Sequence, residues 1–88
     1  MIEIYVWGLD VVTYDSEKKK YEKWSTTCSG DVTPSPVRRP EIDNLFNWWC
    51  IKMDNLENAK QFISEYRRAW VQKNHREFKK VLKKYGLL

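Results

Sequence analysis

The chain has 88 residues, and its 16 Lys or Arg against 12 Asp or Glu give a formal net charge of +4. This length predicts one domain, and the five Trp, five Tyr and three Phe argue against a disordered chain, since disordered chains are poor in aromatic residues. No apolar run approaches the roughly 18 residues that span a bilayer, and the first residues lack the basic and apolar segments of a secretory signal. We therefore expect a small cytoplasmic protein without membrane contact.

Residues 1–28 predict a β-hairpin. The run 1–14 begins by alternating aliphatic residues with polar or aromatic ones, the period of two that a half-buried strand requires. Gly8 interrupts this run and indicates a bulge or a bend in the strand. A polar turn over 15–19 and a second β-type run over 20–28 complete an antiparallel hairpin with a charged tip.

The middle of the chain predicts a loop followed by a strand. Residues 29–43 contain all three prolines, which remove backbone donors and disfavour helical geometry in the residues before them. This loop is interpreted as a connector or as a segment that inserts into a partner's groove. Residues 45–53 are rich in aromatic and β-branched side chains on both faces, which predicts a third, central strand.

Residues 55–86 predict two helices. Asp54 and Glu57 have the spacing of a capping box, and Asn74 and Glu77 repeat it before the second helix. Apolar residues recur at three and four positions in both segments. The expected apolar stripes are Leu56, Ala59, Phe62, Ile63, Tyr66 and Trp70 in the first helix, and Phe78, Val81, Leu82 and Tyr85 in the second.

These elements predict one α+β domain over residues 1–88. A small antiparallel three-stranded sheet, made of the N-terminal hairpin and the third strand, is covered on one face by the two C-terminal helices. The sequence contains no internal repeats.

Few residues suggest chemistry. Cys28 and Cys50 are interpreted as reduced, partly buried thiols, with a bridge between them as the alternative if strands place them side by side. One His and two scattered Cys supply no usual zinc ligand set, and His75 could pair with a cysteine only through the fold. The three glycines are too far apart for a phosphate-binding loop. We expect no enzyme activity, no metal and no cofactor.

Charge is distributed unevenly along the chain. Residues 1–53 contain seven basic and eight acidic residues (net −1), whereas residues 54–88 contain nine basic and four acidic ones (net +5). A positive helical face attracts nucleic-acid phosphates or an acidic protein surface. Exposed helix surfaces without a binding role are also commonly rich in lysine. The basic candidates for partner binding are Arg67, Arg68, Arg76, Lys79, Lys80 and Lys83.

The aromatic residues suggest a second binding surface. Trp48 and Trp49 are adjacent, so on a strand they face opposite sides and cannot both enter one core. Exposed Trp and Tyr beside Arg are typical of interface hot spots, and they also suit base stacking on single strands, although no RNP-like motif is present. The aromatic candidates for partner binding are Tyr5, Trp7, Trp24, Trp48 and Trp49.

The segment from Phe62 to Gln72, FISEYRRAWVQ, follows a capped helix start and resembles a helix of small phage-encoded anti-CRISPR proteins of the type II-A class. The compact plan of short antiparallel strands and helices is similar too. The resemblance implies an anti-defence inhibitor that acts inside the host cell on a larger host protein, such as a nucleic-acid-processing complex. Those relatives are strongly acidic and imitate DNA, whereas this helix is basic. Inhibition would then have to work by another mode, such as gripping an acidic protein surface or competing for nucleic acid.

Together these features predict a non-enzymatic inhibitor or modulator that binds a larger protein by occupying its surface. The alternative is a nucleic-acid-binding domain that uses the basic face of the C-terminal helices. The two differ in salt dependence, because phosphate binding weakens by about 0.9 log units per log unit of salt for each phosphate neutralised on duplex DNA.

Overall fold

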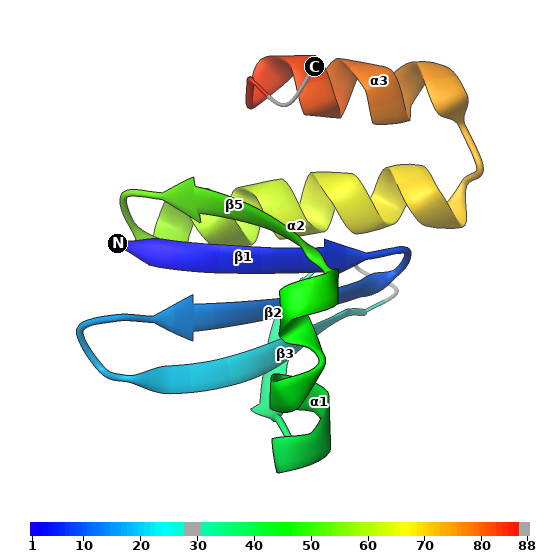
Figure 1. Ribbon diagram of the computed structural model, residues 1–88. Helices are drawn as coiled ribbons and strands as arrows, with labels where there is room; N and C mark the ends of the chain where they lie inside the picture. Colours follow the sequence, from blue (N-terminus) through cyan, green and yellow to red (C-terminus); the bar gives the residue numbers. More distant parts are fainter. Residues whose placement is uncertain (28–30, 87–88) are drawn as a thin grey trace.

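The computed structural model describes residues 1–27 and 31–86. It is an α+β structure with one antiparallel sheet and two C-terminal helices (Figure 1). In chain order the elements are β1 (Ile2–Trp7), β2 (Asp10–Asp15), β3 (Lys20–Thr26), β4 (Val32–Pro36), α1 (Arg39–Asp43), η1 (Leu45–Asn47), β5 (Trp49–Met53), α2 (Leu56–Val71) and α3 (His75–Lys84). In the described part of the chain, no helix combines the length and apolarity needed to cross a membrane.

The sheet has five strands in the order β4-β3-β2-β1-β5, so the prediction of three strands was wrong. One reason is Gly8, which lies in a hairpin turn rather than at a bulge. Trp7 pairs with Asp10, so Gly8 and Leu9 form a two-residue turn that divides the predicted strand 1–14 into β1 and β2. The φ angle of Gly8 is +61°, a left-handed conformation that suits glycine.

The predicted proline loop contains the edge strand β4, which the sequence analysis did not predict. Pro34 and Pro36 are tolerated there because an edge strand can leave one row of donors unpaired. Pro40 stands in the first turn of α1, where a missing N–H costs nothing. Residues 45–53 also differ from the prediction: the first three form η1, and β5 lies at the other edge of the sheet rather than at its centre.

The main core lies between one face of the sheet, here called the helix face, and α2. Phe62 and Ile63 of α2 are fully buried, as are Ile4 and Val11 of the sheet. Trp24 is also buried, and its Nε1 donates a hydrogen bond of 2.7 Å to Thr13 Oγ1. The remaining buried members of the core are Ile2, Val6, Ala59, Tyr66 and Val81.

The opposite face of the sheet, here called the second face, is partly covered as well. Val12 points to this face and is fully buried, and Leu45 of η1 is buried too. Figure 1 shows the α1–η1 segment crossing the sheet on this side. The expectation that helices cover only one face was therefore incomplete, because the chain between β4 and β5 returns across the second face.

The two long helices have different roles. α2 covers the sheet, whereas α3 packs mainly on α2 and lies beyond β5 (Figure 1). Asn74 caps α3 as predicted, its side chain accepting from the N–H groups of Arg76 and Glu77. The cap of α2 is Asn55, not Asp54: its side chain accepts from Asn58 N at 2.9 Å. Of the two long helices, α2 thus covers the sheet, and α3 is positioned mainly by its contacts with α2.

Core packing predicts the effect of truncating the two aromatic residues of α2. Phe62→Ala should lower the free energy of unfolding by about 3–5 kcal/mol, because Phe62 is fully buried. Trp70 was expected in the core but is 41% exposed, so Trp70→Ala should cost about half as much or less. Urea denaturation followed by circular dichroism measures both variants. Equal losses would contradict this assignment of the core.

Glu65 predicts an acid-sensitive contact between α2 and α3. Its carboxylate accepts from Tyr85 Oη at 2.7 Å and from Lys84 Nζ at 2.9 Å. Burial raises the pKa of Glu65, but these hydrogen bonds outweigh burial and leave the pKa below its ordinary value of 4.5. The contact therefore stabilises the fold fully above that ordinary value and is lost as the pH falls through the lowered pKa.

Glu65→Gln should accordingly reduce stability at pH 7 and much less at pH 3. The side chain of Glu65 is 33% exposed, so the loss at pH 7 should be about 1 kcal/mol or less. Urea midpoints of both proteins at the two pH values measure it. If the two proteins differ in urea midpoint as much at pH 3 as at pH 7, the ionised carboxylate of Glu65 does not stabilise the fold.

Candidate protein-binding surface

Large apolar side chains are exposed at one end of the molecule. Trp7 is 58% and Trp49 69% exposed, and Leu9, Trp70 and Val71 are exposed as well. We call these five residues the apolar end. They come from the end of β1, the following turn, the start of β5 and the end of α2. An exposed apolar cluster of this kind is typical of an interaction site, whereas isolated apolar residues are ordinary.

The antiparallel register explains why Trp7 and Trp49 lie at the same end of the sheet. Val6 pairs with Trp49, so the start of β5 lies beside the end of β1. Trp7 points to the second face of the sheet and Trp49 to the helix face, so the two indoles flank the end of β1 from opposite sides. Both indoles are therefore exposed at this end, one on each face of the sheet.

The turn at this end is fastened to α2. Tyr66 Oη donates a hydrogen bond of 2.8 Å to the carbonyl oxygen of Gly8. Arg67 donates through Nε to Thr26 Oγ1 at 2.7 Å and through Nη1 to the carbonyl oxygen of Leu9. Arg67 therefore helps to position the apolar end, and its predicted part in partner binding stays a prediction.

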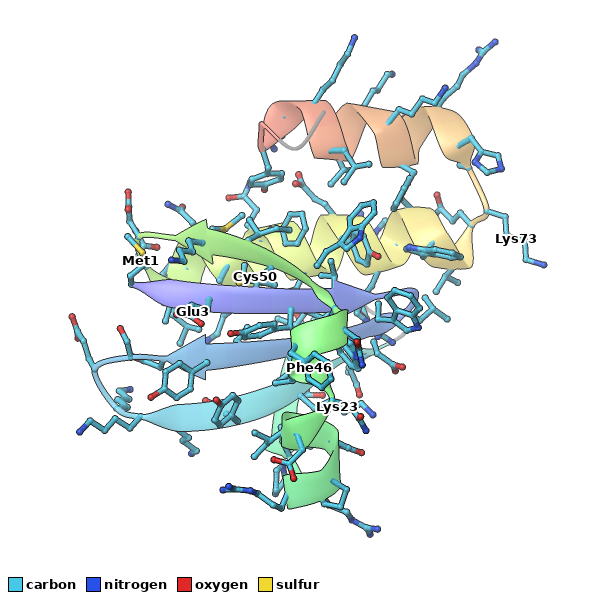
Figure 2. All side chains as sticks on the ribbon, viewed as in Figure 1. Met1, Glu3, Lys23, Phe46, Cys50 and Lys73 are labelled. Atoms are coloured by element: carbon cyan, nitrogen blue, oxygen red, sulfur yellow. The ribbon has the colours of Figure 1, made fainter. Side chains whose placement is uncertain are left out.

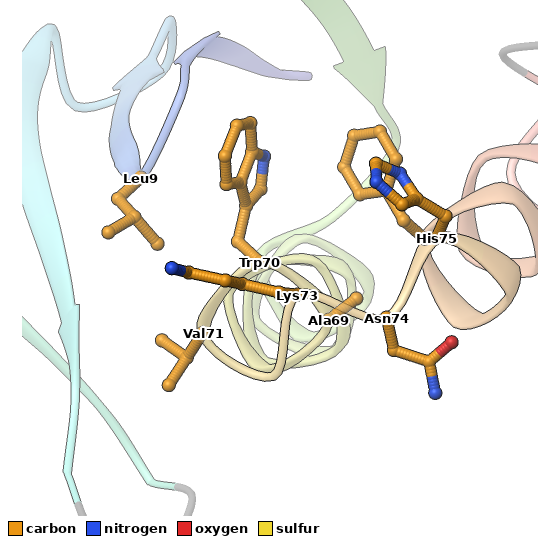
Figure 3. Close-up of a pocket in the computed structure, with 8 residues that line it drawn as sticks. Leu9, Ala69, Trp70, Val71, Lys73, Asn74 and His75 are labelled. Atoms are coloured by element: carbon orange, nitrogen blue, oxygen red, sulfur yellow. The ribbon is translucent and has the colours of Figure 1, made fainter.

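A pocket of about 600 Å³ opens at the apolar end (Figure 3). Figure 3 shows Trp70 projecting between Leu9 and His75. The indole of Trp70 contacts Phe78 edge-on, with ring centroids 5.8 Å apart. Lys73, which extends outward from the turn between α2 and α3 (Figure 2), adds a positive charge to the rim.

A second pocket of about 670 Å³ lies on the second face of the sheet. Trp7 and the half-buried Trp48 line it. Lys23 Nζ lies 3.9 Å from Asp10 and 3.8 Å from Glu41 across the same pocket. The charged residues that line this pocket are one lysine and two carboxylates, in contrast to the positive rim of the first pocket.

The structure separates the predicted aromatic residues. Trp7 and Trp49 are exposed, but Trp24 is 2% exposed and belongs to the core, so its prediction as a partner-binding residue was wrong. Tyr5 is half-buried, and its hydroxyl donates to Glu3 Oε2 at 2.6 Å, which raises the pKa of Tyr5. These contacts hold Tyr5 within the second face.

Besides Met1, four exposed apolar residues were missed from the sequence. Trp70 and Val71 close α2 where the helix extends past the sheet, and Leu9 lies in the hairpin turn. Phe46, 81% exposed, belongs to η1 on the second face. The sequence contained an indication that Trp70 is exposed. The apolar stripe of a long helix can continue into its last turn, beyond the sheet on which the rest of the helix packs.

The basic candidates on α3 are exposed. Figure 2 shows long side chains extending from α3 on the side away from α2. Lys80 Nζ lies 3.6 Å from Glu77, an exposed pair that stabilises the helix little. The exposed candidates are Arg68, Arg76, Lys79, Lys80 and Lys83. They lie beside the apolar end rather than within it.

Cys50 is an exposed thiol on β5, so the expectation of a partly buried thiol was wrong for this residue. Protein atoms that displace part of the water around the sulfur, and the nearby Glu3, raise the pKa of Cys50, which keeps the thiol protonated and weakly nucleophilic at neutral pH. Cys28 lies outside the described residues, so its pairing stays a prediction. Within residues 1–27 and 31–86, no three His, Cys, Asp or Glu residues gather in a metal-binding arrangement.

The exposure of Trp7 and Trp49 predicts how the fluorescence of the protein responds to quenching. The Trp7→Phe, Trp49→Phe double variant should retain a clearly smaller fraction of acrylamide-accessible fluorescence, because the two most exposed indoles are gone. Trp48→Phe, which removes a half-buried indole, is the matched control. Unchanged accessibility in the double variant would mean that these two indoles are covered in solution.

Comparison of the chain with protein-family models, curated proteins and solved structures finds no match. The resemblance of residues 62–72 to a helix of anti-CRISPR proteins therefore stays a prediction. Function has to be inferred from the surface chemistry of the chain itself.

Proposed function

We propose that this protein is a non-enzymatic binding module that occupies the surface of a larger protein, with the apolar end at the centre of the interface. The observation that carries this proposal is the exposure of Trp7 and Trp49 beside Trp70 at one end of the fold. Tryptophan is enriched among residues whose truncation weakens protein complexes most. Tyr66 and Arg67 fasten the turn at this end to α2, so the surface is held in shape before binding.

The charge of the surrounding surface favours an acidic partner. Lys73 stands at the rim of the 600 Å³ pocket, and the exterior of α3 adds further positive charge. Complementary charge around an apolar centre accelerates encounter and excludes wrong partners more than it adds affinity. We therefore place the apolar residues at the centre of the interface and the lysines at its margin.

Within this proposal the protein inhibits or modulates a host protein, in the manner of anti-CRISPR and other anti-defence proteins of phages and mobile elements. The target would be a protein with an acidic surface, for which a nucleic-acid-processing complex is one class. The basic α2 and α3 support contact with such a surface rather than imitation of DNA.

The alternative function is nucleic-acid binding by the exterior of α3. Arg76, Lys79 and Lys83 are exposed along this helix, as phosphate contacts require. Base recognition on single strands would need aromatic side chains among these cations. The exposed tryptophans instead come from β1, β5 and the end of α2, which favours a protein partner.

Affinity capture from a host lysate, with and without nuclease, tests the proposal. The Trp7→Ala, Trp49→Ala double variant should fail to capture a partner that the wild type retains, since a hot-spot residue is worth about 2 kcal/mol or more. Tyr21→Ala is the matched control, because Tyr21 lies on β3 near the turn between β2 and β3, at the opposite end of the sheet. Equal capture by the double variant and the wild type would contradict an interface at the apolar end.

Binding measurements with the captured partner distinguish the two proposed functions. Replacing Lys79, Lys80 and Lys83 by Gln should slow association and leave dissociation nearly unchanged if the partner is a protein. For a nucleic acid the same change should weaken binding to all sequences and flatten the salt slope by up to about three. Capture that nuclease abolishes, together with such a flattened slope, would favour the alternative.

A further inference from the structure

The second pocket, on the second face of the sheet, combines aromatic rings with carboxylates. Two indoles and two carboxylates border its volume of about 670 Å³, together with one lysine and two asparagines. The residues that line it are Trp7, Asp10, Lys23, Glu41, Asn44, Asn47 and Trp48. This composition differs from that of the first pocket, whose lining is mainly apolar and whose charged residue is Lys73.

Strand register and the crossing segment position these groups. Trp7 pairs with Asp10, and Lys23 pairs with Val12, so the side chains of Trp7, Asp10 and Lys23 all point to the second face. The α1–η1 segment, which crosses this face, supplies the other wall (Figure 1). Figure 2 shows Lys23 beside that segment. The pocket therefore lies between the sheet and the chain that returns across it.

Lys23 only partly neutralises the two carboxylates. Its Nζ lies 3.9 Å from Asp10 Oδ1 and 3.8 Å from Glu41 Oε1, and both distances exceed the range of a hydrogen bond. The side chains of Asp10 and Glu41 are 53% and 41% exposed, so a ligand can reach them. One positive charge against two negative ones leaves the lining with a net charge of −1, on a chain whose net charge is +4.

These groups suit a flat cation that donates hydrogen bonds. A guanidinium group is planar, has N–H donors and no acceptor, binds carboxylates through paired hydrogen bonds and stacks on aromatic rings. Tryptophan is the aromatic residue that attracts cations most strongly. An ammonium group is a compact and strongly hydrated charge, so it uses indole faces less well. An anionic ligand would be repelled by the net negative charge of the lining.

We propose that the second pocket binds the guanidinium group of an arginine side chain of the partner protein, through hydrogen bonds to Asp10 and Glu41 and stacking on an indole. This rests on the proposed function, because Trp7 belongs to the apolar end and also lines the pocket, so a partner that covers Trp7 reaches it. The partner presents acidic groups to the exterior of α3 and an arginine to the second face. These opposite charges define its orientation on the protein.

The first test adds a capped alanine–arginine–alanine peptide to the full-length protein. NMR titration should show saturable shifts of the indole N–H signals of Trp7 and Trp48 but not of Trp70, with a dissociation constant on the order of a few millimolar for so small a ligand. The matched control peptide contains citrulline, whose neutral urea group has the shape of guanidinium, and should bind at least about tenfold more weakly. Absence of these shifts, or equal binding of the two peptides, would overturn the proposal.

A matched pair of variants separates local charge from net charge. Glu41→Gln should weaken binding of the arginine peptide by about fivefold or more and should reduce the amount of partner captured from a lysate. Asp43→Asn changes the net charge by the same amount on the same helix, outside the lining of the pocket, and should alter neither measurement. Equal effects of the two variants would show that the pocket does not select the ligand.

Lys23→Met tests the charge argument in the opposite direction. This variant removes the ammonium group that competes for the carboxylates and keeps an apolar side chain of similar length, so the arginine peptide should bind about threefold more tightly or better. Unchanged or weaker binding would contradict a site selected by its negative charge.

The peptide and capture experiments fail in distinguishable ways. If the arginine peptide does not bind and capture still requires Trp7 and Trp49, the proposed function stands and only the arginine contact is removed. If the peptide binds but capture does not require Trp7 and Trp49, the proposed function fails, and with it the assignment of the arginine to that partner. Shifts of Trp7 and Trp48 that depend on protein concentration without peptide would identify a second copy as the occupant and overturn the proposal.

Discussion

Phe62 and Ile63 of α2 are buried against Ile4 and Val11 of the sheet, and the positions of the other elements follow from this contact. α2 is the helix that covers the helix face. If α2 detached, the apolar side chains of β1, β2 and β3 would be exposed to water. The hairpin turn at Gly8 is hydrogen-bonded to α2 through Tyr66, and α3 packs mainly on α2. A substitution in this contact should therefore disturb the candidate surface as well as the fold.

The same arrangement separates two surface properties along the molecule. The apolar residues are exposed where strands and α2 come to an end, whereas the cations are exposed along the side of α3. Apolar contacts govern how long a complex survives, and long-range charge governs how fast it forms. Because different elements carry the two properties, mutation should change the association and dissociation rates of the proposed complex separately.

Sequence periodicity predicted the α+β class, both long helices and the cap at Asn74, because those features depend on residues close together in the chain. It did not predict the five-stranded sheet: Gly8 is compatible with a bulge or a turn, and only the pairing of Trp7 with Asp10 decides between them. The edge position of β5 depends on the order of strands, which local sequence does not encode.

The candidate surface was harder to predict than the fold. Trp7 and Trp24 both lie in strands rich in aromatic or polar residues, yet one is exposed and the other buried, since α2 covers only the helix face. Arg67 looked like a surface cation, but its side chain reaches Thr26 and Leu9, contacts between residues more than 40 positions apart. Burial and pairing across such separations arise from tertiary packing and are invisible to a pattern read along the chain.

The prolines of β4 also limit how molecules of this chain can stack. A fibre grows only if each subunit offers two complementary surfaces, so that every addition recreates a site for the next. With Pro34 and Pro36 obstructing one border of the sheet, an addition at β5 exposes no equivalent border for further growth. Edge-to-edge association through this sheet therefore terminates after one step, and a protein rich in exposed tryptophan avoids open-ended polymerisation by this route.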